Sequence, residues 1–162
     1  MNFKQVTFAL VATGTVLVGS ASSASADVHT QVFTRQYKSM QTGKCLDSRT
    51  NYTNTGAAAV RQVSCHGPRH KDIKHQVWIR NNDGTFRPLI NTHNCLTVYG
   101  TAAVVMHKCT GHRDQQWDWT GGAHGRLKNR KTNKCLSTYS GSIYFLVDKC
   151  STGGNKRVWH RY

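Results

Sequence analysis

A five-residue phrase centred on Cys-Leu occurs three times, as GKCLD at 43–47, HNCLT at 93–97 and NKCLS at 133–137. The first copy ends on a carboxylate, Asp47, whereas the other two end on the hydroxyls of Thr97 and Ser137. A carboxylate accepts hydrogen bonds from two neighbouring ligand hydroxyls, and charged acceptors form the stronger bonds. Asp47 is therefore a candidate binding residue. The alternative is a structural carboxylate that caps a turn or pairs with Arg49 or Arg61.

Other chemically active residues do not form a recognisable centre. His66, His70 and His75 lie close together, but Gly67-Pro68 opposes the helix that i,i+4 metal ligation would need, so we expect a solvated loop and no metal. No serine stands in a nucleophile motif, and the seven aspartates nominate no pair for glycoside hydrolysis. The sequence thus predicts no catalytic residue, no cofactor and no enzyme activity.

Residues 1–26 are typical of a signal peptide. Lys4 precedes the apolar stretch 6–19, and small residues at 20–26 give an A-x-A cleavage pattern before Asp27. The apolar stretch is too short to span a bilayer core of roughly 30 Å. We expect a secreted, extracellular protein without membrane insertion, whose mature form is one domain over 27–162. Six cysteines in an exported chain predict three disulfides, although six cysteines allow 15 pairings.

The charge is strongly positive, with 22 Lys and Arg against seven acids and a formal net charge of +15. Such a surface attracts polyanions at low salt, or serves solubility alone. The densest basic cluster lies in the last third of the chain, where the candidate anion-binding residues are Arg126, Lys128, Arg130, Lys131, Lys156 and Arg157. No recognised nucleic-acid module is present, so sequence-specific nucleic-acid binding is not expected.

The cysteines divide the chain into three repeats. Each has Cys-Leu, a second Cys (65, 109 or 150) and a Trp near its end (78, 117 or 159). We call them unit one (about 36–80), unit two (86–120) and unit three (126–162). Short β-branched or aromatic runs at 104–109 and 143–150, and the alternating run 126–130, predict strands. Units of this size cannot bury a core alone, so they should close around a shared axis, each with its own disulfide.

The three repeats resemble the ricin B-chain type of β-trefoil lectin. Cys-Leu-Asp, the later Cys and a closing Gln-x-Trp carry the resemblance, with HQVW at 75–78, DQQW at 114–117 and a degraded KRVW at 156–159. It implies an all-β trefoil of twelve strands with three-fold pseudo-symmetry and one potential sugar pocket per unit. It also implies disulfides within units, which we take as Cys45–Cys65, Cys95–Cys109 and Cys135–Cys150.

In that family the sugar is held by the acid after Cys-Leu, a Gln and an aromatic residue before the second Cys, and an Asn-Gln pair before the Trp. Carried over, these positions in unit one are Asp47, Arg61, Val63, His75 and Gln76. Unit two has Thr97, Val105, His107 and Asp114, and unit three has Ser137, Leu146, Asp148 and Lys156. We expect that neither of these two units holds a sugar in the family's way, and that Asp47 is the acid still placed to act.

The resemblance and the charge together predict a secreted, non-catalytic lectin-like module that binds carbohydrate or an acidic cell-wall polymer. Such a module acts alone or as the targeting subunit of a larger secreted assembly such as a toxin, with a protein partner. The alternative is a structural or interaction protein whose sugar sites are all dead and whose basic surface binds a protein or polyanion.

Overall fold

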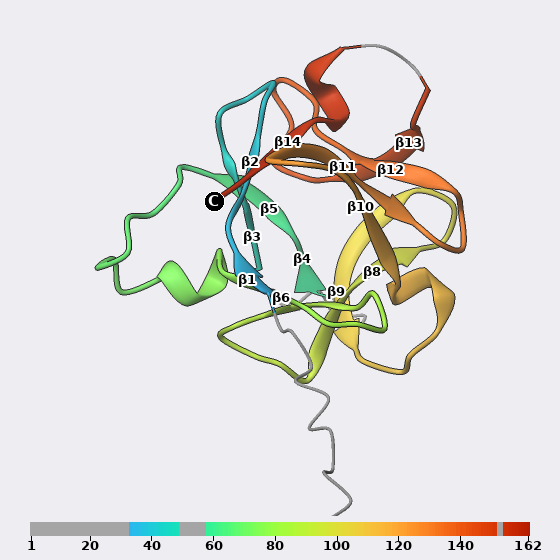
Figure 1. Ribbon diagram of the computed structural model, residues 1–162, viewed down its shortest axis with the longest axis horizontal. Coiled ribbons are helices and arrows are strands. Elements are labelled where there is room, and N and C mark those ends of the chain that lie inside the picture. The colour runs from blue at the N-terminus through green and yellow to red at the C-terminus, as the bar shows by residue number, and fades with distance from the viewer. Residues whose placement is uncertain (1–32, 49–57, 152–153) are drawn as a thin grey trace, which may run out of the picture.

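The computed structural model describes residues 33–48, 58–151 and 154–162, which are built from strands and three short 3-10 helices (Figure 1). The predicted signal peptide lies outside these residues. Within the described ranges, no helix is long and apolar enough to cross a membrane.

Unit one contains the strands β1 (Phe33–Arg35), β2 (Tyr37–Ser39), β3 (Cys45–Asp47), β4 (Ala58–Ala59), β5 (Arg61–Val63) and β6 (Trp78–Arg80), and the 3-10 helix η1 (Ile73–His75). Unit two contains β7 (Phe86–Pro88), β8 (Asn94–Tyr99), β9 (Ala103–Lys108), η2 (Arg113–Gln115) and β10 (Trp117–Gly121). Unit three contains β11 (His124–Asn129), β12 (Lys134–Ser137), β13 (Leu146–Lys149), η3 (Asn155–Arg157) and β14 (Trp159–Arg161).

The expected four strands per unit are present, and two strands of unit one are interrupted. β1 and β2 are separated by Gln36, and β4 and β5 by Val60. Gln36 exchanges backbone hydrogen bonds with the C-terminal residue Tyr162, of 3.0 Å and 3.3 Å. Val60 is fully buried in the core. Both breaks therefore lie at residues that hold the barrel together.

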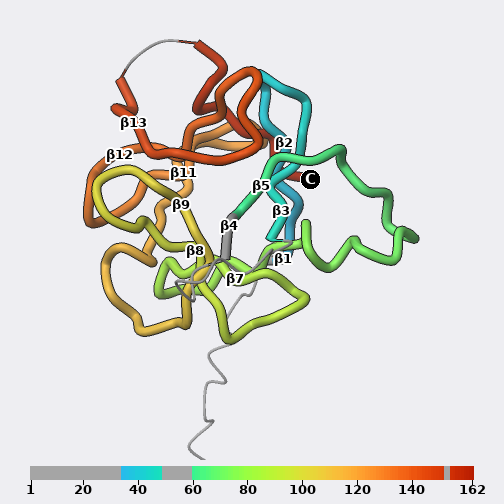
Figure 2. The backbone as a smooth tube through the Cα atoms, turned by 180° about the vertical axis from the view of Figure 1, so that it is seen from behind, coloured from blue at the N-terminus to red at the C-terminus, as the bar shows by residue number. Residues whose placement is uncertain are grey.

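The strands pair antiparallel into one curled sheet of 11 strands and a smaller sheet β1-β6-β7. The large sheet follows the order β4-β9-β13-β12-β11-β14-β2-β3-β5, with β10 on β11 and β8 on β9. Neighbouring units are joined where β13 pairs with β9, β14 with β2, and β4 with β9. Seen from behind, the three units lie side by side around one barrel (Figure 2).

A repeated tryptophan anchors the core of each unit. Trp78, Trp117 and Trp159 are fully buried. Each indole Nε1 donates a hydrogen bond to the carbonyl of the Leu in its own Cys-Leu pair, over 3.0 Å to Leu46, 2.8 Å to Leu96 and 3.2 Å to Leu136. A buried indole N–H needs such a partner. The motif thus ties the end of each unit to its beginning, and the expected all-β trefoil architecture is confirmed.

Three disulfides lie one within each unit, joining Cys45 to Cys65, Cys95 to Cys109 and Cys135 to Cys150. The cysteines of each pair are 20, 14 and 15 residues apart. Closing a loop of this length stabilises the fold by about 3 kcal/mol in the chain-entropy model. No cysteine in the described part of the chain is free.

The predicted strand at 143–150 is shorter in the structure, where β13 begins only at Leu146. Tyr144 makes an isolated bridge with Arg61 of unit one instead, and Phe145 turns into the core at 1% exposure. The segment before β13 therefore connects units one and three. The predicted strands at 104–109 and 126–130 correspond to β9 and β11.

Candidate functional site

In unit one the structure brings Asp47 and Gln76 together inside the protein. The carboxylate Oδ2 of Asp47 accepts a 3.1 Å hydrogen bond from the amide Nε2 of Gln76, and the two residues are 1% and 0% exposed. The same amide donates to the carbonyl of Ser64 and accepts from the backbone N–H of His66 and the side chain of Gln36. Asp47 and Gln76 are therefore held in a buried network that fixes the end of β3.

The other predicted residues of unit one lie in different surroundings. Arg61 lies opposite Asp47 in the β3–β5 pairing and is half-buried, as is Val63. His75 belongs to a different hollow of about 220 Å³ between units one and two, which Ser48, Pro88 and Ile90 also line. Val63 cannot supply the aromatic ring of the family's pocket, and Tyr52, an aromatic residue of the same unit that would replace it, lies outside the described residues.

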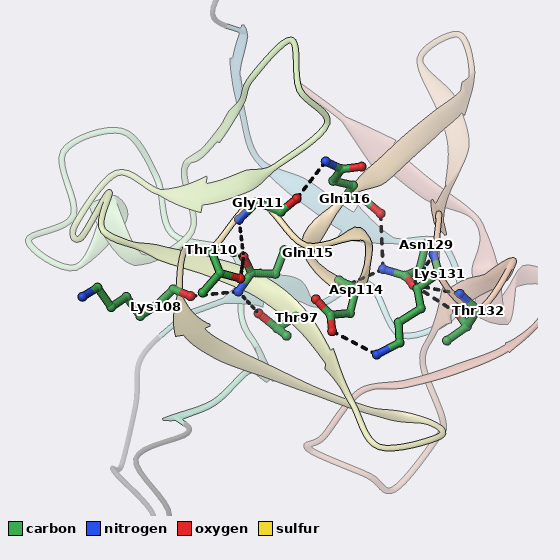
Figure 3. A network of polar contacts seen from close by, with 10 residues as sticks. All are labelled: Thr97, Lys108, Thr110, Gly111, Asp114, Gln115, Gln116, Asn129, Lys131 and Thr132. Carbon is green, nitrogen blue, oxygen red and sulfur yellow. Dashed lines mark hydrogen bonds and ion pairs between the residues drawn. The ribbon is translucent and has the colours of Figure 1, made fainter.

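In unit two an equivalent network has a different composition. Gln115 is 1% exposed, and its Nε2 donates to Thr97 Oγ1 over 3.3 Å and to the carbonyl of Lys108 over 2.8 Å. Its Oε1 accepts from the backbone N–H groups of Thr110 and Gly111 over 2.7 Å and 3.2 Å (Figure 3). The Thr97 hydroxyl also donates to the carbonyl of Cys95 over 2.8 Å. The hydroxyl thus satisfies this position without a carboxylate.

An open pocket of about 380 Å³ lies over this network. Its outer wall carries Tyr99, which is 61% exposed, together with the exposed imidazoles of His107 and His112. Its polar side carries Asp114, whose Oδ2 lies 3.1 Å from Lys131 Nζ. One hollow therefore combines a carboxylate, two imidazoles and an exposed aromatic ring of unit two with the ammonium of Lys131.

Lys131 comes from unit three and is set by a buried turn. Asn129 is 0% exposed, and its Oδ1 accepts hydrogen bonds from the backbone N–H groups of Lys131 and Thr132, each over 3.1 Å (Figure 3). Its Nδ2 donates to the carbonyl of Asp114 over 2.9 Å. One asparagine thus fixes the backbone at both residues of the ion pair, while the Lys131 side chain itself remains 57% exposed.

In unit three the corresponding polar groups bind one another. Asp148 accepts hydrogen bonds from the guanidinium of Arg157 and, over 3.2 Å, from the hydroxyl of Tyr139. Lys156 Nζ lies 5.2 Å from the centre of the Tyr139 ring. The backbone N–H of Lys149, and then the hydrogen bond from Arg157, hold the pKa of Asp148 below its ordinary value. Unit three therefore fills its own site with internal contacts.

The residues predicted to bind anions differ in how exposed their charges are. Arg157, at 3% exposure, is buried and pairs with Asp148, whose side chain is 40% exposed. Arg130 forms an ion pair with Asp118 at 2.8 Å, and Lys131 is the partner of Asp114. Arg126 and Lys128 are half-buried side chains of β11, and Lys156 is exposed beside Tyr139. These residues do not form one uniform basic face.

The histidine loop predicted not to hold a metal contains a stacked pair, with His66 and His70 ring centres 3.8 Å apart. No group of three or more His, Cys, Asp or Glu side chains suited to a metal ion occurs within 33–48, 58–151 and 154–162.

The sequence did not single out Tyr99, His112 and Lys131 as residues of the unit two pocket. The signal that bears on them is Asp114, which directly precedes the Gln of Gln-x-Trp where the family has Asn. Tyr99 ends β8 two residues after Thr97, so that both side chains project from the same side of the strand. Lys131 belongs to the next unit, and repeat-by-repeat alignment does not find residues that cross between units.

Comparison with known proteins gives the family. The model of the ricin-type beta-trefoil lectin domain matches residues 33–159. The chain therefore belongs to this family, which consists of carbohydrate-binding modules rather than catalytic domains. Among curated proteins, a probable alpha-galactosidase A of Aspergillus clavatus is 34% identical over 109 residues, which is 67% of this chain and 18% of that protein. The chain thus spans less than a fifth of the length of this relative.

Solved structures of low sequence identity share the fold. The β-trefoil lectin of the Vibrio vulnificus hemolysin/cytolysin, solved with N-acetyl-D-lactosamine bound, has a TM-score of 0.63 at 21% identity, covering 82% of this chain and 95% of that one. A non-toxic homologue of type II RIPs from Momordica charantia, in complex with alpha-methyl-D-galactoside, has a TM-score of 0.64 at 17% identity, covering 81% and 48%. At these identities the likeness establishes the trefoil fold.

Proposed function

We propose that this protein is a secreted, non-catalytic lectin module that binds carbohydrate through the open pocket of unit two. The observation that carries the proposal is the pairing of Asp114 and Lys131 at 3.1 Å beside the exposed ring of Tyr99. A carboxylate accepts and an ammonium donates hydrogen bonds, so that adjacent sugar hydroxyls find both kinds of partner. An aromatic ring covers the apolar C–H face of a sugar.

The rigid floor of the pocket supports this role. Gln115 and Asn129 are almost fully buried. Gln115 donates to the carbonyl of Lys108, and Asn129 donates to the carbonyls of Asp114 and Gln116. Side chains held in this way lose little conformational freedom when a ligand binds, which favours affinity. The pocket of about 380 Å³ lies in the size range of small-molecule sites.

Galactose-containing glycans are the proposed ligand class. The two structural neighbours were solved with N-acetyl-D-lactosamine and with alpha-methyl-D-galactoside, and the curated relative is a probable alpha-galactosidase A. Because the chain covers 18% of that relative, we propose the role of a targeting module, alone or with a protein partner in a larger secreted assembly. The three disulfides support an oxidising, extracellular location.

The residues predicted in unit one remain a second proposed site in the same protein. Asp47 keeps the family's acid and Arg61 lies opposite it, but the Asp47 carboxylate already binds Gln76 at 1% exposure. A sugar would have to reach this carboxylate from the side away from Gln76. In unit two the Asp114 side chain is 20% exposed and lines an open pocket, and we therefore rank that pocket first.

A glycan array probed at two salt concentrations tests the function. We expect binding to neutral galactose-terminated glycans that persists at high salt, because hydrogen bonds and ring contacts at short range are little screened. Binding to no neutral glycan at either salt concentration would contradict the proposal.

One observation favours a second candidate function, polyanion binding through the basic surface. The formal net charge is +15, and three of the seven acids, Asp114, Asp118 and Asp148, already have basic partners. Array signals restricted to anionic glycans, and lost steeply as salt rises, would favour this function through counterion release.

A further inference from the structure

One end of the barrel carries a layer of cationic and aromatic side chains. Residues two apart in a strand project from the same face. The core tryptophan of each unit is followed two residues later by Arg80, Trp119 or Arg161. Because the tryptophans fill the core, these three side chains form the next layer outward at the pseudo-three-fold positions.

Two of these side chains, Arg80 and Arg161, line a pocket of about 450 Å³ that is separate from the three sugar positions of the units. Its lining consists of Arg35, Tyr37, Arg80, Ala123 and Arg161. Tyr37 and Arg161 are direct partners in the β2–β14 pairing. Strands from both ends of the chain and the turn between β10 and β11 therefore build the pocket together.

The three arginines have no acidic partner among the residues that the structure describes. The ion pairs found there involve Arg130, Lys131 and Arg157. None of the described residues that line the pocket is acidic. The Nε–H of Arg80 is buried and donates to no acceptor among the described residues, and Arg35 donates to the neighbouring carbonyl of Thr34 over 2.9 Å. The pocket thus combines three positive charges with guanidinium N–H groups that can donate to a ligand.

Trp119 holds one of these guanidinium groups in place. The Arg161 guanidinium lies 5.3 Å from the centre of the Trp119 ring, a cation–π distance. Trp119 packs edge-on against Tyr37 at 5.4 Å, and its Nε1 donates to the carbonyl of Gly122 over 3.0 Å. A Cβ at Gly125 would lie 2.7 Å from the Trp119 ring, so glycine is what allows the ring to lie against β11.

Tyr37 reports the electrostatic character of the pocket. Burial of the phenol raises its pKa to about 12, because the ionised form is desolvated. Arg80, Arg161 and Arg35 each act in the opposite direction, which places all three charges within electrostatic range of the same hydroxyl.

We propose that this arginine pocket, formed by Arg35, Arg80 and Arg161 around Tyr37, binds a tetrahedral oxyanion, as a sulfate or phosphate ester group. The guanidinium fork matches the oxygens of such groups, and three forks on separate strands suit a group with several charged oxygens. Like charges that line one pocket repel one another, and a bound dianion offsets that repulsion. The site is independent of the unit two sugar pocket, so either proposal stands if the other fails.

Nuclear magnetic resonance of the arginine Nε–H groups tests the proposal directly. The protein would be titrated with sodium sulfate while sodium chloride keeps the ionic strength constant. We expect saturable shifts at Arg80 Nε–H, Arg161 Nε–H and the Trp119 indole. Shifts that stay linear, or that chloride alone reproduces, would overturn the proposal.

A charge-matched pair of variants separates a site from net charge. The double variant Arg80→Gln with Arg161→Gln should weaken sulfate binding roughly tenfold or more, because two charged hydrogen-bond donors are lost. Arg69→Gln with Lys71→Gln removes the same charge from an exposed loop and should leave binding unchanged. Equal weakening in both would overturn the proposal.

Stability without an anion gives a second readout. Removing two mutually repelling cations should leave the melting temperature of the Arg80→Gln, Arg161→Gln variant at or above that of the wild type in low-salt chloride. Sulfate stabilises proteins in general through exclusion from their surface. The predicted signature is therefore a smaller sulfate-induced rise in this variant than in the loop control. A rise of equal size would contradict a site.

Two esters distinguish the source of the oxyanion. Binding to a heparin oligosaccharide that is lost on its chemical desulfation would assign a sulfated glycan. Binding to methyl phosphate without binding to heparin would assign a phosphate ester. Binding of free sulfate with neither ester would overturn the assignment to an ester group. Neutral-glycan binding should be unchanged in the Arg80→Gln, Arg161→Gln variant, which keeps this test distinct from that of the sugar pocket.

Discussion

Units one and two differ in the residue that follows Cys-Leu and in what lies over it. In unit one the residue after Cys-Leu is Asp47, which is buried and accepts a hydrogen bond from Gln76. In unit two it is Thr97, which accepts from Gln115, while an open pocket lies over the network and takes its carboxylate from Asp114. In both units, therefore, the side chain after Cys-Leu accepts a hydrogen bond from the glutamine of Gln-x-Trp, whether it is an acid or a hydroxyl. A unit that lacks an acid there can still present one from a neighbouring position.

The strongest expected effect concerns the two glutamines themselves. Gln76→Ala and Gln115→Ala should each lower the free energy of unfolding by about 2–4 kcal/mol, because buried backbone groups lose their partners. Denaturant unfolding measures this change. Glycan binding should weaken in Gln115→Ala and remain in Gln76→Ala at temperatures where both are folded. Equal loss of binding would show that the two units are not functionally different.

Replacing each of the two carboxylates by an amide, one at a time, should separate the effect on binding from the effect on stability. Asp114→Asn should weaken glycan binding by roughly 1.5–3 kcal/mol, tenfold or more, because a charged acceptor becomes neutral. Asp47→Asn should instead lower stability by about 1 kcal/mol and leave binding unchanged. Calorimetric titration and thermal melting of both variants measure these effects. Weaker binding in Asp47→Asn, with unchanged binding in Asp114→Asn, would place the sugar in unit one.

The exposed ring of Tyr99 should contribute less. Tyr99→Ala should weaken glycan binding by about 1 kcal/mol, or roughly fivefold, through loss of the ring contact. Tyr144→Ala is the matched control, because Tyr144 is 54% exposed in unit three against 61% for Tyr99. The same titration measures both. Undiminished binding by Tyr99→Ala would remove the ring from the proposed site.

The smallest expected effect concerns Asp148 of unit three and the stability of the protein at acidic pH. Because the pKa of Asp148 is lowered in the folded protein, its contribution to stability is present above its ordinary value near 3.8 and is lost as pH falls through the lowered value. Asp148→Asn should therefore flatten the decline of stability in this acidic range, as followed by denaturant unfolding at several pH values. An unchanged profile would mean that Asp148 does not titrate with folding.

The repeats and their resemblance to a known family made the trefoil, the disulfide pairs and the tryptophan cores predictable, because each depends on residues that recur in the same order in every unit. The unit two pocket was not predictable in full. Thr97 in place of an acid suggested a dead site, and the sequence alone does not show that Gln115 uses that hydroxyl as a structural partner. Lys131 reaches the pocket from unit three, and a contact between units depends on the closed barrel rather than on any local pattern.

The most direct test of where this lectin domain binds sugar is a titration of the isotope-labelled protein with N-acetyl-D-lactosamine, followed by amide chemical shifts. We expect saturable shifts around Tyr99, Thr110, Asp114 and Lys131, with the amides of Asp47 and Gln76 unmoved. Shifts centred on Asp47 and Gln76, or none at millimolar sugar, would contradict binding through the pocket of unit two.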